Sequence, residues 1–223
     1  MSRIATYFCS TIGRKQTMAI AGLGLCGFVF MHATGNMLLL KSPEAYNRYS
    51  HALVTNPLIL LAEAGLVAMF LGHIVFGIAM TIRNYGARPV NYAKSAGGTK
   101  STSLTTKLMA AQGVVILFYL INHILMFKYG PEYDVTYGAD HMRDLFKLVY
   151  ETFQKPAFVT WYIGAVVLLA FHLSHGLYSA IQTLGLNHPA YMPKVKWASI
   201  LYGLFVGAMF ISQPLYMFFI FKG

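Results

Sequence analysis

Five long apolar runs constrain this chain more than any other feature of its sequence. They cover residues 16–40, 57–82, 107–128, 157–184 and 197–221. Each run reaches the ~20 residues that an α-helix needs to cross a hydrocarbon core of ~30 Å. The runs lack the two-residue alternation of a membrane β-barrel. The sequence therefore predicts an all-α membrane protein, a bundle of five transmembrane helices that forms a single domain over residues 1–223.

The composition excludes the main alternative classes. Charged residues make up 11% of the 223 residues and apolar residues 57%, whereas a soluble protein carries about 25% charged residues. The net charge of +10 is spread as single or paired cations between apolar runs, which is not typical of a nucleic-acid-binding surface. Cys9 and Cys26 are the two cysteines, so neither a disulfide scaffold nor covalent haem attachment is expected.

Local signals mark the ends of several runs. Asn56 and Pro57 provide an N-cap and a first-turn proline for the second helix, and Pro89 follows its end. Pro214 lies inside the last run and is expected to kink that helix. We expect the loop 129–156 to lie outside the membrane and to contain a short surface helix.

The distribution of charge predicts the orientation of the bundle. With the N-terminus inside, the inner segments hold ten cations and no acid, and the outer segments hold seven cations and all seven acids. The inner cations are Arg3, Arg14, Lys15, Arg83, Arg88, Lys94, Lys100, Lys107, Lys194 and Lys196, and the outer ones are Lys41, Arg48, Lys128, Arg143, Lys147, Lys155 and Lys222. The positive-inside rule then predicts a cytoplasmic N-terminus.

Histidines carry the clearest chemical signal. His51, His141 and His188 lie outside the runs and are expected to be exposed. The other five are His32, His73, His123, His172 and His175, distributed over the first four runs. Ionisable residues inside a membrane usually face the bundle interior. One buried histidine is compatible with simple interhelical hydrogen bonding, but a histidine on each of four helices favours axial ligands of haem iron.

The depths of these histidines sort them into two levels. At ~1.5 Å per residue, His32 lies ~12 Å and His123 ~8 Å from the outer ends of their helices. His73 lies ~14 Å from the inner end of its helix, with His172 and His175 at ~18 and ~14 Å. Two stacked bis-histidine haems need such a pairing, whereas zinc needs further ligands at each level. Depth slightly favours His175 over His172 as the partner of His73.

Several motifs give the chain a resemblance to a known family. They are Gly13-Arg14-Lys15-Gln16, Met31-His32-Ala33-Thr34-Gly35-Asn36, Gly72-His73, Asn122-His123 and Phe171-His172-Leu173-Ser174-His175-Gly176-Leu177. With five spans, the chain resembles the cytochrome b558 subunit of succinate:quinone oxidoreductases over nearly its entire length. It is most similar to the dihaem membrane anchor that bacterial succinate dehydrogenases and fumarate reductases form from a single polypeptide.

The resemblance implies a set of ligands and partners. In that family the fourth-helix ligand lies four residues before a Gly-Leu pair and thirteen before a closing glycine, which selects His172 over His175. His73 and His172 would then bind a proximal haem b near the cytoplasm, and His32 and His123 a distal haem b. An iron–sulfur subunit and an FAD-containing flavoprotein, which holds the dicarboxylate active site, would dock on the cytoplasmic face of the bacterial inner membrane.

The expected role is electron transfer in the respiratory chain and the tricarboxylic acid cycle, between the iron–sulfur subunit and a membrane quinone, expected to be menaquinone. Glu63 is the only acid in a span and is our candidate for quinone protonation, although charge complementation at a helix N-terminus also explains it. Two alternatives stay open. One is the cytochrome b of a hydrogenase or formate dehydrogenase, and the other is a small non-redox transporter.

Overall fold

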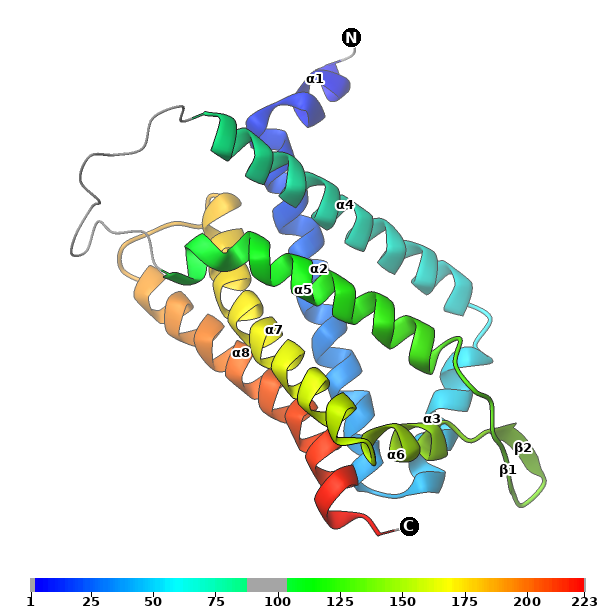
Figure 1. Cartoon of the computed structure of the whole chain (residues 1–223). Coiled ribbons are helices and arrows are strands. Elements are labelled where there is room, and N and C mark those ends of the chain that lie inside the picture. Colours follow the sequence, from blue (N-terminus) through cyan, green and yellow to red (C-terminus); the bar gives the residue numbers. More distant parts are fainter. Residues whose placement is uncertain (1–2, 88–103, 223) are drawn as a thin grey trace.

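The computed structural model describes residues 3–87 and 104–222, most of which are helical (Figure 1). The helices are α1 (Arg3–Cys9), α2 (Thr11–Asn36), α3 (Pro43–Val54), α4 (Ile59–Gly86), α5 (Leu104–Phe127), α6 (Leu145–Phe153), α7 (Pro156–Thr183) and α8 (Met192–Leu215). A 3-10 helix, η1 (Met37–Leu40), continues α2, and a π-helix, η3 (Tyr216–Ile220), continues α8. The strands β1 (Asp134–Tyr137) and β2 (Asp140–Arg143) form an antiparallel hairpin.

Five helices in the described ranges are long and apolar enough to cross a membrane, namely α2 with η1, α4, α5, α7, and α8 with η3. The prediction of a multi-pass helical protein with five spans is therefore confirmed. The first and last of these helices begin five residues earlier than predicted, at Thr11 and Met192. Polar residues can extend a helix beyond its apolar core, and the Ser10 hydroxyl caps α2 by accepting the Gly13 amide at 3.0 Å.

The other boundary predictions have mixed outcomes. Helix α4 begins at Ile59, and Asn56 caps the turn before it by accepting the Leu58 amide at 2.9 Å through Oδ1. Pro214 lies inside α8, which changes to a π-helix at Tyr216. The surface helix expected within 129–156 is α6. Pro89, Arg88, Lys94 and Lys100 lie outside the described residues.

The spanning helices run alternately up and down, so the two termini lie at opposite ends of the bundle (Figure 1). Helix α7 packs most extensively against α8 and also contacts α2 and α5, while α4 packs mainly against α2. Helices α4 and α5 contact each other little. We call the end that holds the start of α2 the N-terminal end, and the end that holds α3, α6, the hairpin and η3 the C-terminal end.

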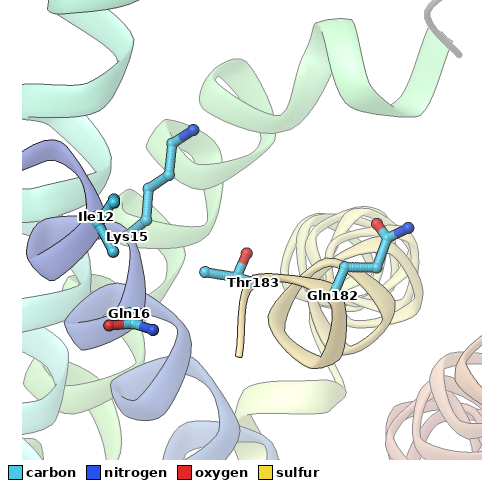
Figure 2. A pocket seen from close by; sticks show the side chains of 5 residues that line it. All are labelled: Ile12, Lys15, Gln16, Gln182 and Thr183. Atoms are coloured by element: carbon cyan, nitrogen blue, oxygen red, sulfur yellow. The ribbon is translucent and has the colours of Figure 1, made fainter. Parts of the chain in front are cut away.

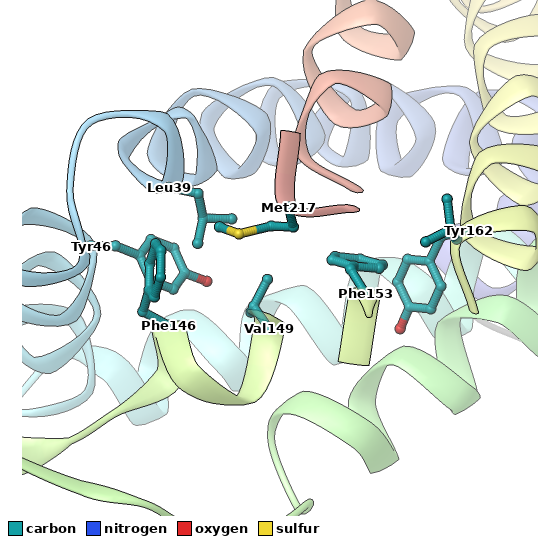
Figure 3. Close-up of a cluster of buried hydrophobic side chains, with 8 residues drawn as sticks. Leu39, Tyr46, Phe146, Val149, Phe153, Tyr162 and Met217 are labelled. Atoms are coloured by element: carbon teal, nitrogen blue, oxygen red, sulfur yellow. The ribbon is translucent and has the colours of Figure 1, made fainter. Parts of the chain in front are cut away.

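A cluster of buried side chains closes the C-terminal end (Figure 3). It joins η1, α3, α6, α7 and η3 through Leu39, Tyr46, Phe146, Val149, Phe153, Val159, Tyr162 and Met217. Burial raises the pKa of the Tyr46 phenol, so the group stays protonated and donates to Asn36 Oδ1 at 3.1 Å. The cluster thereby anchors α3 to the end of α2.

Asn47 fixes this end of the bundle through polar contacts. Its side chain is fully buried and donates through Nδ2 to Asp144 Oδ1 at 2.8 Å and to Tyr137 Oη at 3.2 Å. Its Oδ1 accepts the Phe146 amide at 2.9 Å. Buried amides are retained where their hydrogen bonds are made, so Asn47 ties α3 to both the hairpin and the first turn of α6.

Candidate cofactor-binding site

Four of the five intramembrane histidines meet in two pairs inside the bundle. The imidazoles of His32 on α2 and His123 on α5 have ring centroids 5.8 Å apart with planes at 87°. Those of His73 on α4 and His172 on α7 have centroids 6.1 Å apart with planes at 75°. The structure thus brings together the two pairs that the sequence assigns to different depths, each pair joining two helices that are not consecutive spans.

The spacing within each pair fits one metal ion between two imidazoles. A metal–imidazole bond is about 2 Å long and a ring nitrogen lies about 1.1 Å from its ring centroid, so two axial imidazoles have centroids about 6.2 Å apart. The observed 5.8 and 6.1 Å match this distance. Direct edge-to-face contact gives a similar spacing, so the pairs need a chemical test. Among the described residues, no three or more His, Cys, Asp or Glu side chains gather as a metal site.

His73 has the hydrogen-bonding pattern of a metal ligand. Its Nδ1 lies 3.3 Å from the backbone oxygen of Met18 on α2, which leaves Nε2 free. Histidine ligands generally donate their other ring nitrogen to such an acceptor, which orients the ring. Gly22, one turn further along α2, makes room for this ring, because a Cβ there would lie 3.2 Å from both Cε1 and Nδ1 of His73.

Gly22→Val is expected to push the His73 imidazole away from Met18 and to reduce cofactor retention at the His73–His172 pair by tenfold or more, the range for lost orientation of a ligand. The matched control is Gly27→Val on the same helix, where a Cβ meets nothing within 4 Å. Cofactor content per purified chain measures the effect. Equal content in the two variants would contradict this role for Gly22.

Asn36 and aromatic rings surround His32. The Asn36 amide donates to the His32 backbone oxygen at 2.8 Å and also lies 3.3 Å from Nε2 of the His32 ring. A metal bound through Nε2 would replace this second contact. Phe28 stacks on the imidazole at 5.5 Å with planes at 15°, and the ring of Phe210 on α8 lies 5.9 Å away. Apart from the Asn36 carboxamide, the side chains named around His32 are apolar. Such surroundings are compatible with a flat, largely apolar cofactor that is bound through its metal ion.

His123 lies in a second aromatic shell at the same level. Tyr119 stacks on it with centroids 5.8 Å apart, and Phe127 and Tyr162 contact it at 5.3 and 6.2 Å. Its Nδ1 is buried and has no hydrogen-bond partner within the protein. Since Tyr162 also belongs to the buried cluster that closes the C-terminal end, this histidine pair is the one nearer that end.

The structure favours His172 over His175 as the partner of His73. His172 makes the ring contact with His73, and α5 passes close to it, because a Cβ on Gly113 would lie 3.9 Å from His172 Cε1. Nδ1 of His172 is buried without a partner. His175 is half-buried three residues further along α7 and makes no ring contact with any described residue.

The three remaining histidines are outside both pairs. His51 lies in α3 and is half-buried, His141 lies exposed in β2, and His188 is exposed between α7 and α8, stacked on Tyr191. The expectation that all three are exposed is therefore wrong for His51. His51 lies in the last turn of α3 and not in a loop.

Glu63 lies in the second turn of α4 at the C-terminal end, where Lys128 Nζ donates to its Oε1 at 2.5 Å. Both side chains are partly exposed, at 41% for Glu63 and 46% for Lys128. The pair bridges α4 and α5, which contact each other little elsewhere. The carboxylate is therefore accessible from outside the bundle and is paired with a cation.

A pocket of about 260 Å³ lies at the opposite end, between the start of α2 and the end of α7 (Figure 2). Ile12, Lys15, Gln16, Gln182 and Thr183 line it. Lys15 and Gln16 lie within one turn of Met18, whose carbonyl faces His73. The pocket therefore places a cation and two carboxamides at the N-terminal end of the bundle.

No protein-family model, curated protein or solved structure matches this chain. The chemistry of the two histidine pairs therefore follows from their own geometry. The sequence identifies the four paired histidines because they interrupt apolar runs. It does not assign a role to Met18 or Asn36, since a backbone carbonyl and an amide near a helix end have many other roles.

Proposed function

We propose that this chain is the dihaem cytochrome b membrane anchor of a bacterial succinate:quinone oxidoreductase, with two haems b bound between its helices. The observation that supports the proposal most is the meeting of four intramembrane histidines from four helices in two pairs, each with the centroid spacing of axial ligands. His73 and His172 would hold one haem, and His32 and His123 the other. When bound, haem b supplies reversible one-electron chemistry at its iron.

The surroundings of the pairs support haem rather than an isolated metal ion. Met18 and Gly22 orient His73, and stacked Phe28 and Tyr119 cover the other pair. Haem b also carries two propionates, and the pocket with Lys15 and Gln16 provides the cation and amide donors that carboxylates need. The residues of this chain thus exclude water, orient the ligands and neutralise the anionic edge.

The charge pattern supports an assembly on one side of the membrane. The N-terminal end carries the described cations Arg14, Lys15, Arg83, Lys107, Lys194 and Lys196, whereas every acid of the sequence lies elsewhere. By the positive-inside rule this end would face the cytoplasm. An iron–sulfur subunit and a flavoprotein would dock there, next to the His73–His172 pair, and menaquinone would react at the other pair.

The test is an optical redox titration of the complex purified from haem-replete cells, with identification of the proteins that copurify. We expect two haems b per chain, reduction by succinate or by a quinol, and copurification with an iron–sulfur protein and a flavoprotein. A chain without visible absorbance would overturn the proposal and favour a transporter. Copurification with hydrogenase or formate dehydrogenase subunits would instead assign the cytochrome to that class.

Glu63 provides a further prediction about the quinone. Glu63→Gln is expected to lower succinate:quinone turnover by a hundredfold or more, since general acid–base catalysis contributes about 10²–10⁴-fold, while haem content and dye-linked succinate oxidation stay at wild-type values. Steady-state assays with a short-chain quinone measure this. In the control, Lys128→Met, the ion pair is lost but the carboxylate remains, so turnover should change less than twofold. Equal losses in both variants would show that only the ion pair matters.

A further inference from the structure

Two buried polar atoms near the His73–His172 pair lack partners and are chemically complementary. Nδ1 of His172 on α7 has no hydrogen-bond partner, and neither does Oε1 of Gln112 on α5. The Gln112 side chain is 93% buried, at 7% exposure. A buried polar group without a hydrogen bond is destabilising, because it has lost its contacts with water and gained none in return. A carboxamide in the middle of a spanning helix therefore needs a partner in the functional protein.

The packing of α5 on α7 places these groups at the same level. A Cβ on Gly113, the residue after Gln112, would lie 3.9 Å from Cε1 of His172. Cε1 lies between Nδ1 and Nε2 in the imidazole ring, so α5 passes the corner of the ring that adjoins Nδ1. Gly113 has no side chain to cover that corner. The two groups are not bonded to each other in the structure, but the three rotatable bonds of the Gln112 side chain allow its Oε1 to turn toward Nδ1.

The ring nitrogens of the other paired histidines have different hydrogen-bonding environments. Nδ1 of His73 faces the Met18 carbonyl, whereas Asn36 contacts His32 at Nε2 and not at Nδ1. His123 also has an unpartnered Nδ1, but the unpartnered acceptor nearest to it in sequence, Asn122 Oδ1, lies on the same helix as His123 and not on a helix that packs against its ring. Among the described residues, only the ring of His172 lies next to another helix that carries an unpartnered acceptor.

We propose that Gln112 is a positioning residue for His172, accepting a hydrogen bond from Nδ1–H through Oε1 and so presenting Nε2 to the haem iron. The inference rests on the proposed function, because it assumes that His172 is a ligand. Acceptors of this kind fix the tautomer and raise the basicity of a histidine ligand, and losing them typically costs 10–100-fold in metal affinity. A more basic ligand stabilises ferric iron, so loss of the acceptor should raise the midpoint potential.

The test is a potentiometric titration of the purified complex carrying Gln112→Met, which keeps the side-chain volume without the acceptor. The haem that is absent from His172→Ala should show at least a tenfold higher ratio of reduced to oxidised form at a given potential, a shift of about 59 mV. The other haem should be unchanged. Gln112→Glu, which keeps an acceptor oxygen, should hold the potential at or below the wild-type value. The matched control is Gln213→Met on α8, an equally buried glutamine at the C-terminal end.

The outcomes separate this inference from the proposed function. If the wild-type protein contains no haem, the proposed function fails. If it contains two haems and Gln112→Met changes neither potential, the positioning role is wrong and the function stands. Loss of the His172 haem in Gln112→Met supports the role when Gln112→Glu restores it, and overturns the role when it does not. A shift of the same size in Gln213→Met also overturns it.

Discussion

Replacing either histidine of one pair with alanine is expected to remove one haem b and to leave the other in place. His73→Ala and His172→Ala should give the same single-haem spectrum, and His32→Ala and His123→Ala should give the complementary one. The physical reason is that a bis-histidine haem loses half of its protein–iron bonds when one ligand is removed, while the other pair lies on a different level of the bundle. Haem extraction and low-temperature optical spectra of the four variants measure this.

His175→Ala is the matched control for this series, because His175 lies on the same helix three residues from His172 but makes no ring contact with His73. It should retain both haems with unchanged spectra. Loss of a haem in His175→Ala but not in His172→Ala would identify His175, and not His172, as the ligand. Four variants with full haem content would show that the imidazoles pack edge to face as structural contacts only, and would remove the basis of the proposed function.

The spanning part of the fold could be predicted from the sequence because lipid imposes one requirement on it. About 20 consecutive apolar residues in a helix satisfy all backbone hydrogen bonds within the segment, so the runs map directly onto α2, α4, α5, α7 and α8. The helix ends were less predictable. Polar residues such as Lys15 and Lys194 continue a helix beyond the apolar core, and the apolar pattern alone does not register them.

Helix α3 and the hairpin at the C-terminal end were not predicted from the sequence. Helix α3 has a local start signal in Ser42 and Pro43, since the Ser42 hydroxyl accepts the Ala45 amide at 3.1 Å, but the apolar pattern does not include it. The hairpin has four-residue strands and a turn at Gly138, with φ of +67°. Such short strands depend on long-range contacts like those of Asn47 for their stability, which local sequence does not contain.

The candidate site was also predictable only in part. Depth along a helix follows from residue number and the rise per residue, so His32 with His123 and His73 with His172 could be grouped from the sequence. Depth slightly favoured His175, whereas the structure pairs His172 with His73, because that choice depends on the rotation of α7 toward α4. The Lys128 partner of Glu63 is 65 residues away in the chain, and only the packed structure brings the two together.

The contact between α7 and α8 provides the second large expected effect. Gly203 on α8 lies against α7 so closely that a Cβ would overlap the backbone oxygen of Ala170 and the hydroxyl of Ser174, and would lie 3.1 Å from the Ser174 amide. Gly203→Ala is therefore expected to separate the two helices and to destabilise the protein by about 1–3 kcal/mol, the usual cost of overpacking. Because α7 carries His172, part of the haem bound there should also be lost. Thermal unfolding in detergent and haem content per chain measure the two effects.

Two variants decide whether close helix contact is the cause. Gly164→Ala places the same methyl group on α7 where nothing lies within 4 Å, so it should be neutral or stabilise the helix by up to about 1 kcal/mol. Adding Ser174→Ala to Gly203→Ala removes the hydroxyl but leaves the Ala170 carbonyl in place, so stability should recover only partly. Full recovery in the double variant would mean that the helix backbones have more room than the structure shows. A Gly203→Ala protein as stable as Gly164→Ala would contradict the close approach of α7 and α8, and with it the placement of His172 opposite His73.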